Sequence, residues 1–517
     1  MDGKSMEPVA SGSQPSEDNV ARSGLLADNS FKPLKDVHPI RRKQIPRLAH
    51  GLEAVVKKEG VHWLKDPETG KYKFDQHLEQ VPKVSDYDFD RFGGFVTSSQ
   101  DKNLIALAKK NKCKYAGSTS SLTGILTQIY LLLSQEKLLN LANLSSDFET
   151  APRFFTPGQR IPASVILRYR DGIYTTDYDH ERDGDHEEII LLKLGLLLER
   201  FLTMKKEDFE KYHKTYTESD YPQQKDVHRY AKHGKFLMRS QLDCIHESLP
   251  GTGVFDLKTR AISQIRHDVH NYLAYIDCTL DALTGRRGTF EEEYYDMIRS
   301  AFLEYSFQAR IGNMDGILVA YHNTARIFGF QYISLREMDV SLFGRAGAGT
   351  RVFLRCVRLM ELLYEEIAKC FPQQSQSVKC TFEKRGQFLR VWVEPLEHND
   401  PDTEPPIVEL SLGLKNIMHG KIARGAYAVY SSNYPWTIEY QVKRVDGHQE
   451  LVRARRDIAY KRQECISRSL PETLPERQAE DASAASTSPV EAEVEVDEAD
   501  EADEAEGHVV AEGKLTA

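Results

Sequence analysis

The chain has 517 residues, of which 40% are hydrophobic and 28% are charged. This globular composition excludes a collagen, a coiled coil and a chain that is disordered throughout. The formal charge of −10 is localised, because Leu470–Ala517 carries 15 acidic and 2 basic residues and the rest of the chain is slightly basic. The charge alone therefore does not predict nucleic-acid binding.

The cysteines and the hydropathy exclude further classes of protein. Seven cysteines are widely spaced and form no CxxC pair, which argues against a disulfide scaffold and a zinc finger. No run of about 18 apolar residues is present, so we expect no membrane-spanning helix. The N-terminus has acidic residues near its start, unlike a secretory signal or a transit peptide.

Three regions are expected along the chain. Residues 1–40 are rich in Ser, Gly, Pro and Asp without periodicity, and we expect them to be disordered. Residues 41–468 are expected to form one elaborated domain with mixed α and β structure. Residues 469–517 form a low-complexity acidic segment, which we expect to be a disordered tail.

Hydrophobic periodicity and turn residues predict the elements of this domain. In the first half we expect a helix over Leu48–Lys57, a helix capped by Ser120 or Ser121, a hairpin turning at Asp171–Gly172, and a helix over Glu187–Met204. In the second half we expect strands Phe236–Glu247 and Val254–Ala261 joined as a hairpin, helical segments over Phe290–Ile311, strands Gly316–Tyr321 and Gly329–Leu335, a helix over Arg351–Lys369, and a β-rich section that follows it.

The hairpin formed by Gln241–Ala261 carries the candidate site. Asp256 and Lys258 are two residues apart on one strand, so they lie on the same face of the sheet. Pairing across the turn brings Asp243 of the preceding strand close to Asp256. Two carboxylates with a third acid can hold Mg²⁺, and an ammonium beside them can orient a nucleophile for phosphodiester hydrolysis. The alternative without a functional role is that Asp256 and Lys258 form an exposed ion pair.

The chain resembles the fungal mitochondrial RNA-processing family Pet-one-two-seven, within the PD-(D/E)xK nuclease superfamily. The resemblance covers about residues 45–445 and rests on segments that occur in order: IPRLAHGLE, HLEQVPKVSDYDFDRF, GSTSSLTGILTQIYLLLS, SVILRYRDGIYTTDYD, VFDLKTRA and EYSFQARIGNMDGI. It implies a restriction-endonuclease-like α/β fold, with a mixed central sheet flanked by helices. It also implies a 5′-to-3′ exoribonuclease that uses Mg²⁺ or Mn²⁺ in mitochondrial RNA processing and degradation.

The same resemblance implies roles for individual residues. Asp243, Asp256 and the carbonyl of Leu257 would hold the metal, and Lys258 would assist the nucleophile. For the acid from an upstream helix we choose Glu199, with Glu188 and Gln128 as alternatives. Gln308 suits the superfamily position on the helix that follows the Asp-x-Lys strand.

The remaining implications concern partners and location. Arg310, Arg345 and Arg351 are candidates for contacts with an RNA backbone. The family implies peripheral association with the inner mitochondrial membrane and a link to the mitochondrial RNA polymerase, although this N-terminus is not a clear presequence. The alternative function is a non-catalytic factor that binds RNA or the polymerase and regulates RNA stability and 5′ maturation.

Overall fold

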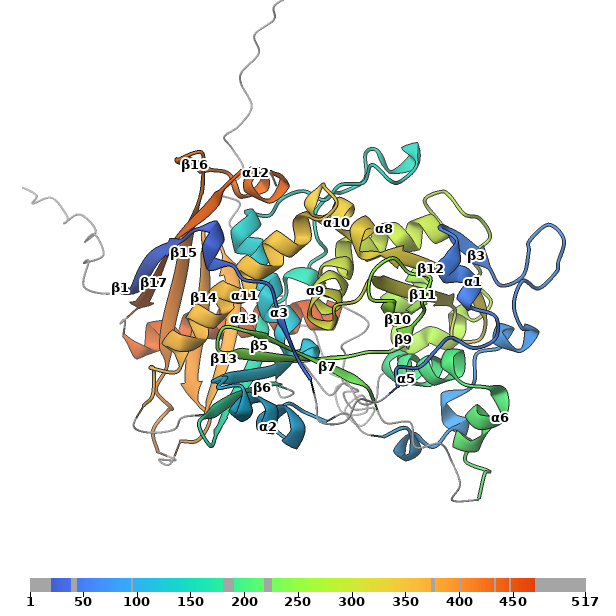
Figure 1. The fold of residues 1–517 in the computed structure, drawn as a ribbon, viewed down its shortest axis with the longest axis horizontal. Helices are drawn as coiled ribbons and strands as arrows, with labels where there is room; N and C mark the ends of the chain where they lie inside the picture. The colour runs from blue at the N-terminus through green and yellow to red at the C-terminus, as the bar shows by residue number, and fades with distance from the viewer. Residues whose placement is uncertain are drawn as a thin grey trace, which may run out of the picture. The chain divides into compact units, whose positions relative to one another are not determined.

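The computed structural model describes residues 20–38, 44–93, 96–179, 190–217, 226–372, 377–398, 402–431, 434–445 and 448–469. Two β-sheets and a set of helices make up this part of the chain (Figure 1). The fold is mixed α/β, which confirms the expected fold class.

The larger sheet has twelve strands among the described residues and is mostly antiparallel. Its order across the sheet is β1 Val20–Leu26, β17 Trp436–Val445, β15 Val408–Met418, β14 Phe388–Pro395, β13 Val378–Arg385, β5 Ala163–Arg170, β6 Ile173–Tyr178, β4 Tyr115–Ser118, β8 Phe236–Gln241, β7 His228–His233 and β2 Lys35–Val37, with β16 Lys421–Ala423 paired to β15. The predicted hairpin at Asp171–Gly172 is confirmed by the antiparallel pair β5–β6.

The smaller sheet carries the candidate site. Its five strands lie in the order β3 Val61–Trp63, β12 Ile327–Ser334, β11 Gly316–His322, β10 Val254–Ala261 and β9 Cys244–Ile245. β10 is antiparallel to β9 and parallel to β11, and helices connect β10 to β11. In chain order, α5 therefore precedes the β9–β10 hairpin, and helices lead from β10 to the parallel strand β11.

The described helices are α1 Glu53–Lys57, α2 Lys102–Lys110, α3 Thr119–Ser134, α5 Ile190–Thr203, α6 Lys206–Phe209, α7 Ser263–His267, α8 Phe290–Ser300, α9 Phe302–Gly312, α10 Leu335–Phe343, α11 Ala348–Ile367, α12 Gly425–Tyr430 and α13 Gln449–Ser469. Helices α3, α9 and α11 lie between the two sheets (Figure 1). Within the described part of the chain, no helix has the length and apolarity needed to cross a membrane.

The smaller sheet is buried on both faces, which fixes the orientation of its side chains. Ile317 and Val319 of β11 pack into the core shared with the larger sheet, whereas Leu318 and Ala320 pack into a second core beneath α5. This alternation follows from the two-residue period of a strand. A central strand with both faces covered therefore holds its neighbour β10 rigidly.

Helix α5 is amphipathic, and its apolar stripe packs against the second core. Leu194, Leu197, Leu198 and Phe201 recur at helical spacing, and all are buried. The helix lies close to β10, since a Cβ on Gly195 would be 3.7 Å from the hydroxyl of Thr259. This packing brings the polar edge of α5 to the end of β10.

The prediction of disorder over residues 1–40 is wrong for part of this segment. Residues 20–37 include strands β1 and β2 and belong to the folded part of the chain. β1 pairs with β17 and forms the edge of the larger sheet, and the Asp28 carboxylate accepts a hydrogen bond from the Trp436 amide at 3.0 Å. Pairing with a distant strand thus overrides the local composition. Residues 1–19 and 470–517 lie outside the described residues.

Several element boundaries also differ. The strand expected over Phe236–Glu247 divides into β8 in the larger sheet and β9 in the smaller one, because the chain passes from one sheet to the other between them. The helical segment Phe290–Ile311 breaks at Ala301 into α8 and α9. The N-cap of α3 is Ser118, and α1 begins only at Glu53. Helix α13 was not predicted.

Candidate active site

Strand β10 presents Asp256 and Lys258 on one face, as their spacing predicted. The neighbouring side chains Phe255 and Leu257 point into the second core. Asp256 is 2% exposed, and its Oδ2 lies 2.5 Å from Lys258 Nζ. Asp256 is buried and Lys258 is only partly exposed, so the alternative of a simple exposed ion pair does not describe them.

Asp243 lies beside this pair, although it belongs to neither β8 nor β9 as the structure defines them. Its carboxylate accepts a hydrogen bond from the Leu257 amide at 2.9 Å. The carboxyl groups of Asp243 and Asp256 are close enough to share a hydrogen bond. The crossing between the two sheets thus delivers Asp243 to the same face of β10 as Asp256.

Glu199 comes to these two acids from α5. Its charge interacts with those of Asp256 and Lys258, and Gln241 Nε2 donates to both of its carboxylate oxygens at 3.4 Å. Arg200 Nη1 lies 3.2 Å from Glu199 Oε1, while Nη2 of the same guanidinium pairs with Asp226 at 2.8 Å. We call Glu199, Asp243 and Asp256 the carboxylate cluster.

Gln308 on α9 connects the two residues of β10. Lys258 Nζ donates to Gln308 Oε1 at 3.1 Å, and Gln308 Nε2 donates to Asp256 Oδ1 at 3.2 Å. Tyr305 lies one turn earlier on α9, and its ring centroid is 5.0 Å from Lys258 Nζ. Helix α9 therefore fixes the position of the ammonium from two sides.

Burial and like charge perturb the acids of the cluster. Desolvation raises the pKa of Glu199 to about 7, with Arg200 opposing the shift and Asp226 and Asp256 adding to it. Burial, together with the charges of Asp256 and Glu199, raises the pKa of Asp243 well above its usual value. Burial lowers the pKa of Lys258, but Asp256, Tyr305 and Asp243 together outweigh burial, and the net pKa is raised. The ammonium thus stays charged beside the acids.

A cavity of about 1010 Å³ opens onto these side chains. The carboxylate cluster, Lys258 and Gln308 all contribute to its lining, as do Ser118 and Ser120 at the start of α3. Ligand sites of this volume are typical for molecules of drug size or larger. The acids and the amine therefore face a space that a segment of a polymer could enter.

Other candidates from the sequence lie elsewhere. Arg310 is buried and paired with Asp339 at 2.5 Å, so a contact with RNA backbone is not compatible with its position. Arg345 and Arg351 do not contribute to the described lining of the cavity. Gln128 donates to the Ile161 carbonyl at 2.6 Å and accepts from the Lys384 amide, so it serves the larger sheet. Glu188 lies outside the described residues.

Two side chains at the site were not assigned by sequence reasoning. Gln241 reaches Glu199 because it ends β8 two residues before Asp243. The ring of Tyr305 lies beside the Lys258 ammonium. Its i, i+3 spacing with Gln308 on a predicted helix is a signal that both face the same way.

The donor atoms of the carboxylate cluster are of the kind that a divalent metal ion binds. All three acids offer oxygen, which Mg²⁺ and Mn²⁺ prefer. Two of them have raised pKa values through burial and mutual repulsion, and a cation between them would offset both effects. Asp256 Oδ2 makes no hydrogen bond within the described structure besides its ion pair with Lys258.

Comparison with known proteins identifies relatives of the chain. The family model described as mitochondrial protein Pet127 matches residues 95–365. The chain is 35% identical to the mitochondrial mRNA degradation protein pet127 of Schizosaccharomyces pombe over 405 residues, covering 77% of this chain and 76% of the relative. It is 38% identical to PET127 of Saccharomyces cerevisiae, described as a candidate component of the mitochondrial translation system, over 57% of this chain and 37% of the relative.

Two solved structures show a distant resemblance. Dxo1 of K. lactis, in complex with manganese, is 10% identical, with a TM-score of 0.31 and coverage of 71% of this chain and 98% of that one. Rai1 of Scheffersomyces stipitis, in complex with (3′-NADP)⁺ and calcium, is 12% identical, with a TM-score of 0.31 and coverage of 71% and 94%. At these values the resemblance assigns no activity.

Proposed function

This chain belongs to the Pet127 family of mitochondrial proteins, and from that membership we propose that it is a metal-dependent 5′-to-3′ exoribonuclease that processes and degrades mitochondrial RNA. The observation that carries the proposal is the meeting of three acids and one ammonium at a single cavity. The Schizosaccharomyces pombe relative is named for mRNA degradation, which favours RNA as the substrate.

The carboxylate cluster would hold the metal ion, with the carbonyl of Leu257 as a further ligand. A divalent cation bound there would neutralise charge on the scissile phosphate and make a bound water more acidic. The acids must be ionised to bind it, so the raised pKa values of Glu199 and Asp243 favour metal binding at neutral to alkaline pH. Gln241 holds the Glu199 carboxylate in place through its amide.

Lys258 and Gln308 would act on the nucleophile and on the developing charge. The ammonium of Lys258 stays protonated beside Asp256, so it serves as a fixed positive charge and hydrogen-bond donor rather than as a general base. Gln308 orients that ammonium by accepting from it and by donating to Asp256. Such preorganised donors stabilise charge without reorganising during the reaction.

Full-length protein incubated with 5′-monophosphorylated RNA and Mg²⁺ or Mn²⁺ tests the proposal. We expect mononucleotides to be released from the 5′ end, and Asp256→Asn to reduce the rate by about 10³-fold or more. Asp277→Asn is the matched control, because Asp277 is exposed and does not line the cavity. Equal rates in Asp256→Asn and wild type would refute this assignment of the site.

A non-catalytic RNA-binding factor is the second candidate function, and one observation favours it. Asp256 pairs with Lys258, and Glu199 pairs with Arg200. Such ion pairs would also hold these side chains in place in a protein without catalytic activity. RNA binding without cleavage under any divalent metal ion would support this function. The expected links to the polymerase and to the inner membrane stay predictions.

A further inference from the structure

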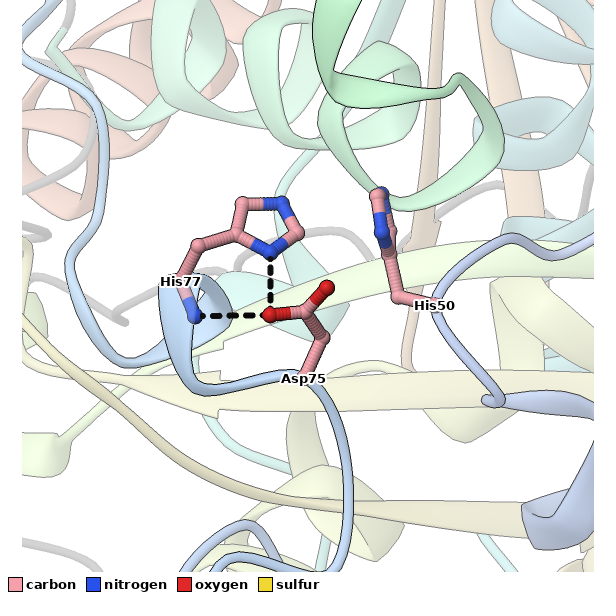
Figure 2. A group of neighbouring side chains, drawn as sticks. All are labelled: His50, Asp75 and His77. Atoms are coloured by element: carbon pink, nitrogen blue, oxygen red, sulfur yellow. Dashed lines mark hydrogen bonds and ion pairs between the residues drawn. The ribbon is translucent and has the colours of Figure 1, made fainter.

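A second group of ligand-type side chains lies outside the cavity. His50, Asp75 and His77 each offer one ligand atom, and these atoms lie within 4.8 Å of one another. Figure 2 shows the three side chains gathered together, with one oxygen of Asp75 facing His77 and the other on the side of His50. We call these residues the histidine cluster. His50 and His77 come from IPRLAHGLE and HLEQVPKVSDYDFDRF, segments that the carboxylate cluster does not use.

His50 is oriented by a backbone carbonyl. Its Nε2 lies 3.1 Å from the carbonyl oxygen of Phe201 near the end of α5. When Nε2 carries the proton and donates to this oxygen, Nδ1 is left with a free lone pair. A ligating histidine in proteins typically donates its other ring N–H to such an acceptor. The contact therefore prepares one ring nitrogen of His50 to bind a metal ion.

The backbone conformation of His50 is also fixed. Its φ of 61° lies in the left-handed region, where residues other than glycine are uncommon. Gly51 follows with a φ of 77°, so two successive residues form a sharp turn. The Ala49 amide donates to the Leu202 carbonyl at 2.9 Å and secures this turn against α5. The ring of His50 is thus presented from a fixed backbone.

His77 and Asp75 face His50 from a short loop. Asp75 accepts from the His77 amide at 3.2 Å at the start of the 3-10 helix Gln76–Glu79, and its Oδ1 lies 3.0 Å from His77 Nδ1. His77 Nε2 is buried and has no hydrogen-bond partner among the described residues. The two imidazole rings lie edge to face with centroids 4.3 Å apart. An orphaned ring nitrogen next to a second imidazole and a carboxylate has the composition of an incomplete coordination shell.

We propose that His50, Asp75 and His77 form a binding site for a zinc-type divalent cation, separate from the carboxylate cluster. Two imidazoles and one carboxylate are ligands that Zn²⁺ accepts, leaving a fourth position for water. The side chain of Asp75 is 56% exposed, which gives an ion a route from solvent. Tetrahedral ligands at zinc lie about 3.4 Å apart, so small side-chain rotations close the site.

The choice of metal follows from the donor atoms. Mg²⁺ and Ca²⁺ bind oxygen ligands, whereas imidazole nitrogen favours zinc and its transition-metal neighbours. Excess Mg²⁺ is therefore expected to leave this site free for zinc.

The bound ion would join three parts of the chain. His50 belongs to the segment before α1, His77 to the loop after β3, and both rings contact Phe201 of α5, with centroids at 6.3 and 5.2 Å. Phe201 is two residues from Glu199 on the same helix. The site would thus fasten the N-terminal segments to the helix that carries one acid of the carboxylate cluster, which is a stabilising role.

Zinc titration of the full-length chain tests this site. The protein is stripped with chelator and titrated with ZnCl₂ in buffer with millimolar Mg²⁺, and bound zinc is measured by elemental analysis after desalting. We expect one tightly bound zinc per chain, lost or weakened at least tenfold in His77→Ala and in Asp75→Asn. Asp75→Asn keeps the size of the side chain, so it tests the charge with little risk to folding, which circular dichroism checks for both variants.

Two controls separate this site from others. His398→Ala removes an exposed histidine from the loop after β14 and is expected to bind zinc as the wild type does. Asp256→Asn disables the carboxylate cluster and is also expected to keep the zinc. Equal zinc affinity in wild type, Asp75→Asn and His77→Ala, or loss of zinc in Asp256→Asn alone, would overturn the proposal. Its outcome is independent of whether the chain cleaves RNA.

Discussion

The carboxylate cluster and the histidine cluster differ in burial, and this difference sets their chemistry. Asp243 is 6% exposed and its pKa is raised by burial, whereas the side chain of Asp75 is 56% exposed and hydrogen bonds from His77 lower its pKa. The same residue type therefore holds a proton readily in one region and loses it readily in the other. The number of acids alone does not say which metal ion, or which pH, a cluster suits.

The two clusters also differ in how the chain holds them. Strand β10, covered on both faces of its sheet, and helices α5 and α9 place the carboxylate cluster and Lys258. A turn and a four-residue 3-10 helix place the histidine cluster. Sites on rigid elements keep the geometry that chemistry requires, whereas a site on loops is suited to fastening segments together. The following predictions test this division of roles.

Among the variants considered next, Lys258→Met is expected to have the largest effect. Removing the ammonium takes away the donor that Gln308 orients and leaves Asp256 without its ion pair. We expect the cleavage rate under single-turnover conditions to fall by about 10²- to 10³-fold, the usual cost of losing one preorganised donor. Lys71→Met, at an exposed lysine, is the matched control. Zinc binding should be unchanged in both variants, and a parallel loss of zinc would contradict the separation of the two clusters.

A smaller loss is expected from Gln308→Leu, because Gln308 positions Lys258 without carrying charge. We expect a drop in cleavage rate of about tenfold, with little change in the concentration of RNA needed for half-maximal rate. Gln308→Glu keeps an acceptor for Lys258 but sets a second negative charge against Asp256, so it should not restore the rate. A wild-type rate in Gln308→Leu would show that α9 does not orient the ammonium.

The sequence predicted the parts of the site that lie on one regular element. The spacing of Asp256 and Lys258 on a strand was sufficient to place them on one face, and the structure brings Asp243, Glu199 and Gln308 to them. The prediction that Asp243 lies within a continuous strand Phe236–Glu247 was wrong, since this segment divides into β8 and β9, which belong to different sheets. A change of sheet across the two residues between β8 and β9 leaves no periodic signal in a sequence.

Long-range pairing explains the other differences. β1 is ordered by β17, more than 400 residues later, and local composition carries no trace of that partner. Arg310 looked like a surface base in the sequence but finds Asp339 in the core. The two histidines of the histidine cluster are 27 residues apart and meet through contacts with α5, and a separation of this length is not a metal-binding spacing that a sequence reveals.

Removing zinc should lower thermal stability through the histidine cluster alone. A ligand present at 100 times its Kd stabilises a folded chain by about 2.7 kcal/mol, which corresponds to a few degrees in Tm for a chain of this size. We expect a zinc chelator to lower the Tm of the wild type by about 2–5 °C in the presence of Mg²⁺. His77→Ala should show no further decrease with the chelator. A chelator effect of equal size in His77→Ala would place the stabilising ion elsewhere.

The smallest effect concerns the pH dependence of the metal-free protein. Glu199 has a pKa raised from 4.5 to about 7 by burial, so the folded chain holds a proton there that the unfolded chain releases. The stability that this proton supports is present below about pH 4.5 and is lost as the pH rises to about 7. Glu199→Gln cannot lose that proton, because its amide is neutral at every pH.

We therefore expect Glu199→Gln to match the wild type near pH 5 and to exceed its stability at pH 8, by at most about 3 kcal/mol. The measurement is Tm against pH in the presence of chelator, with Glu207→Gln on the exposed side of α6 as the matched control. Added Mg²⁺ should reverse the order at pH 8, since the ion stabilises the ionised wild-type acid and finds a weaker ligand in the amide. A pH-dependent gain of the same size in Glu207→Gln would show that burial of Glu199 is not its cause.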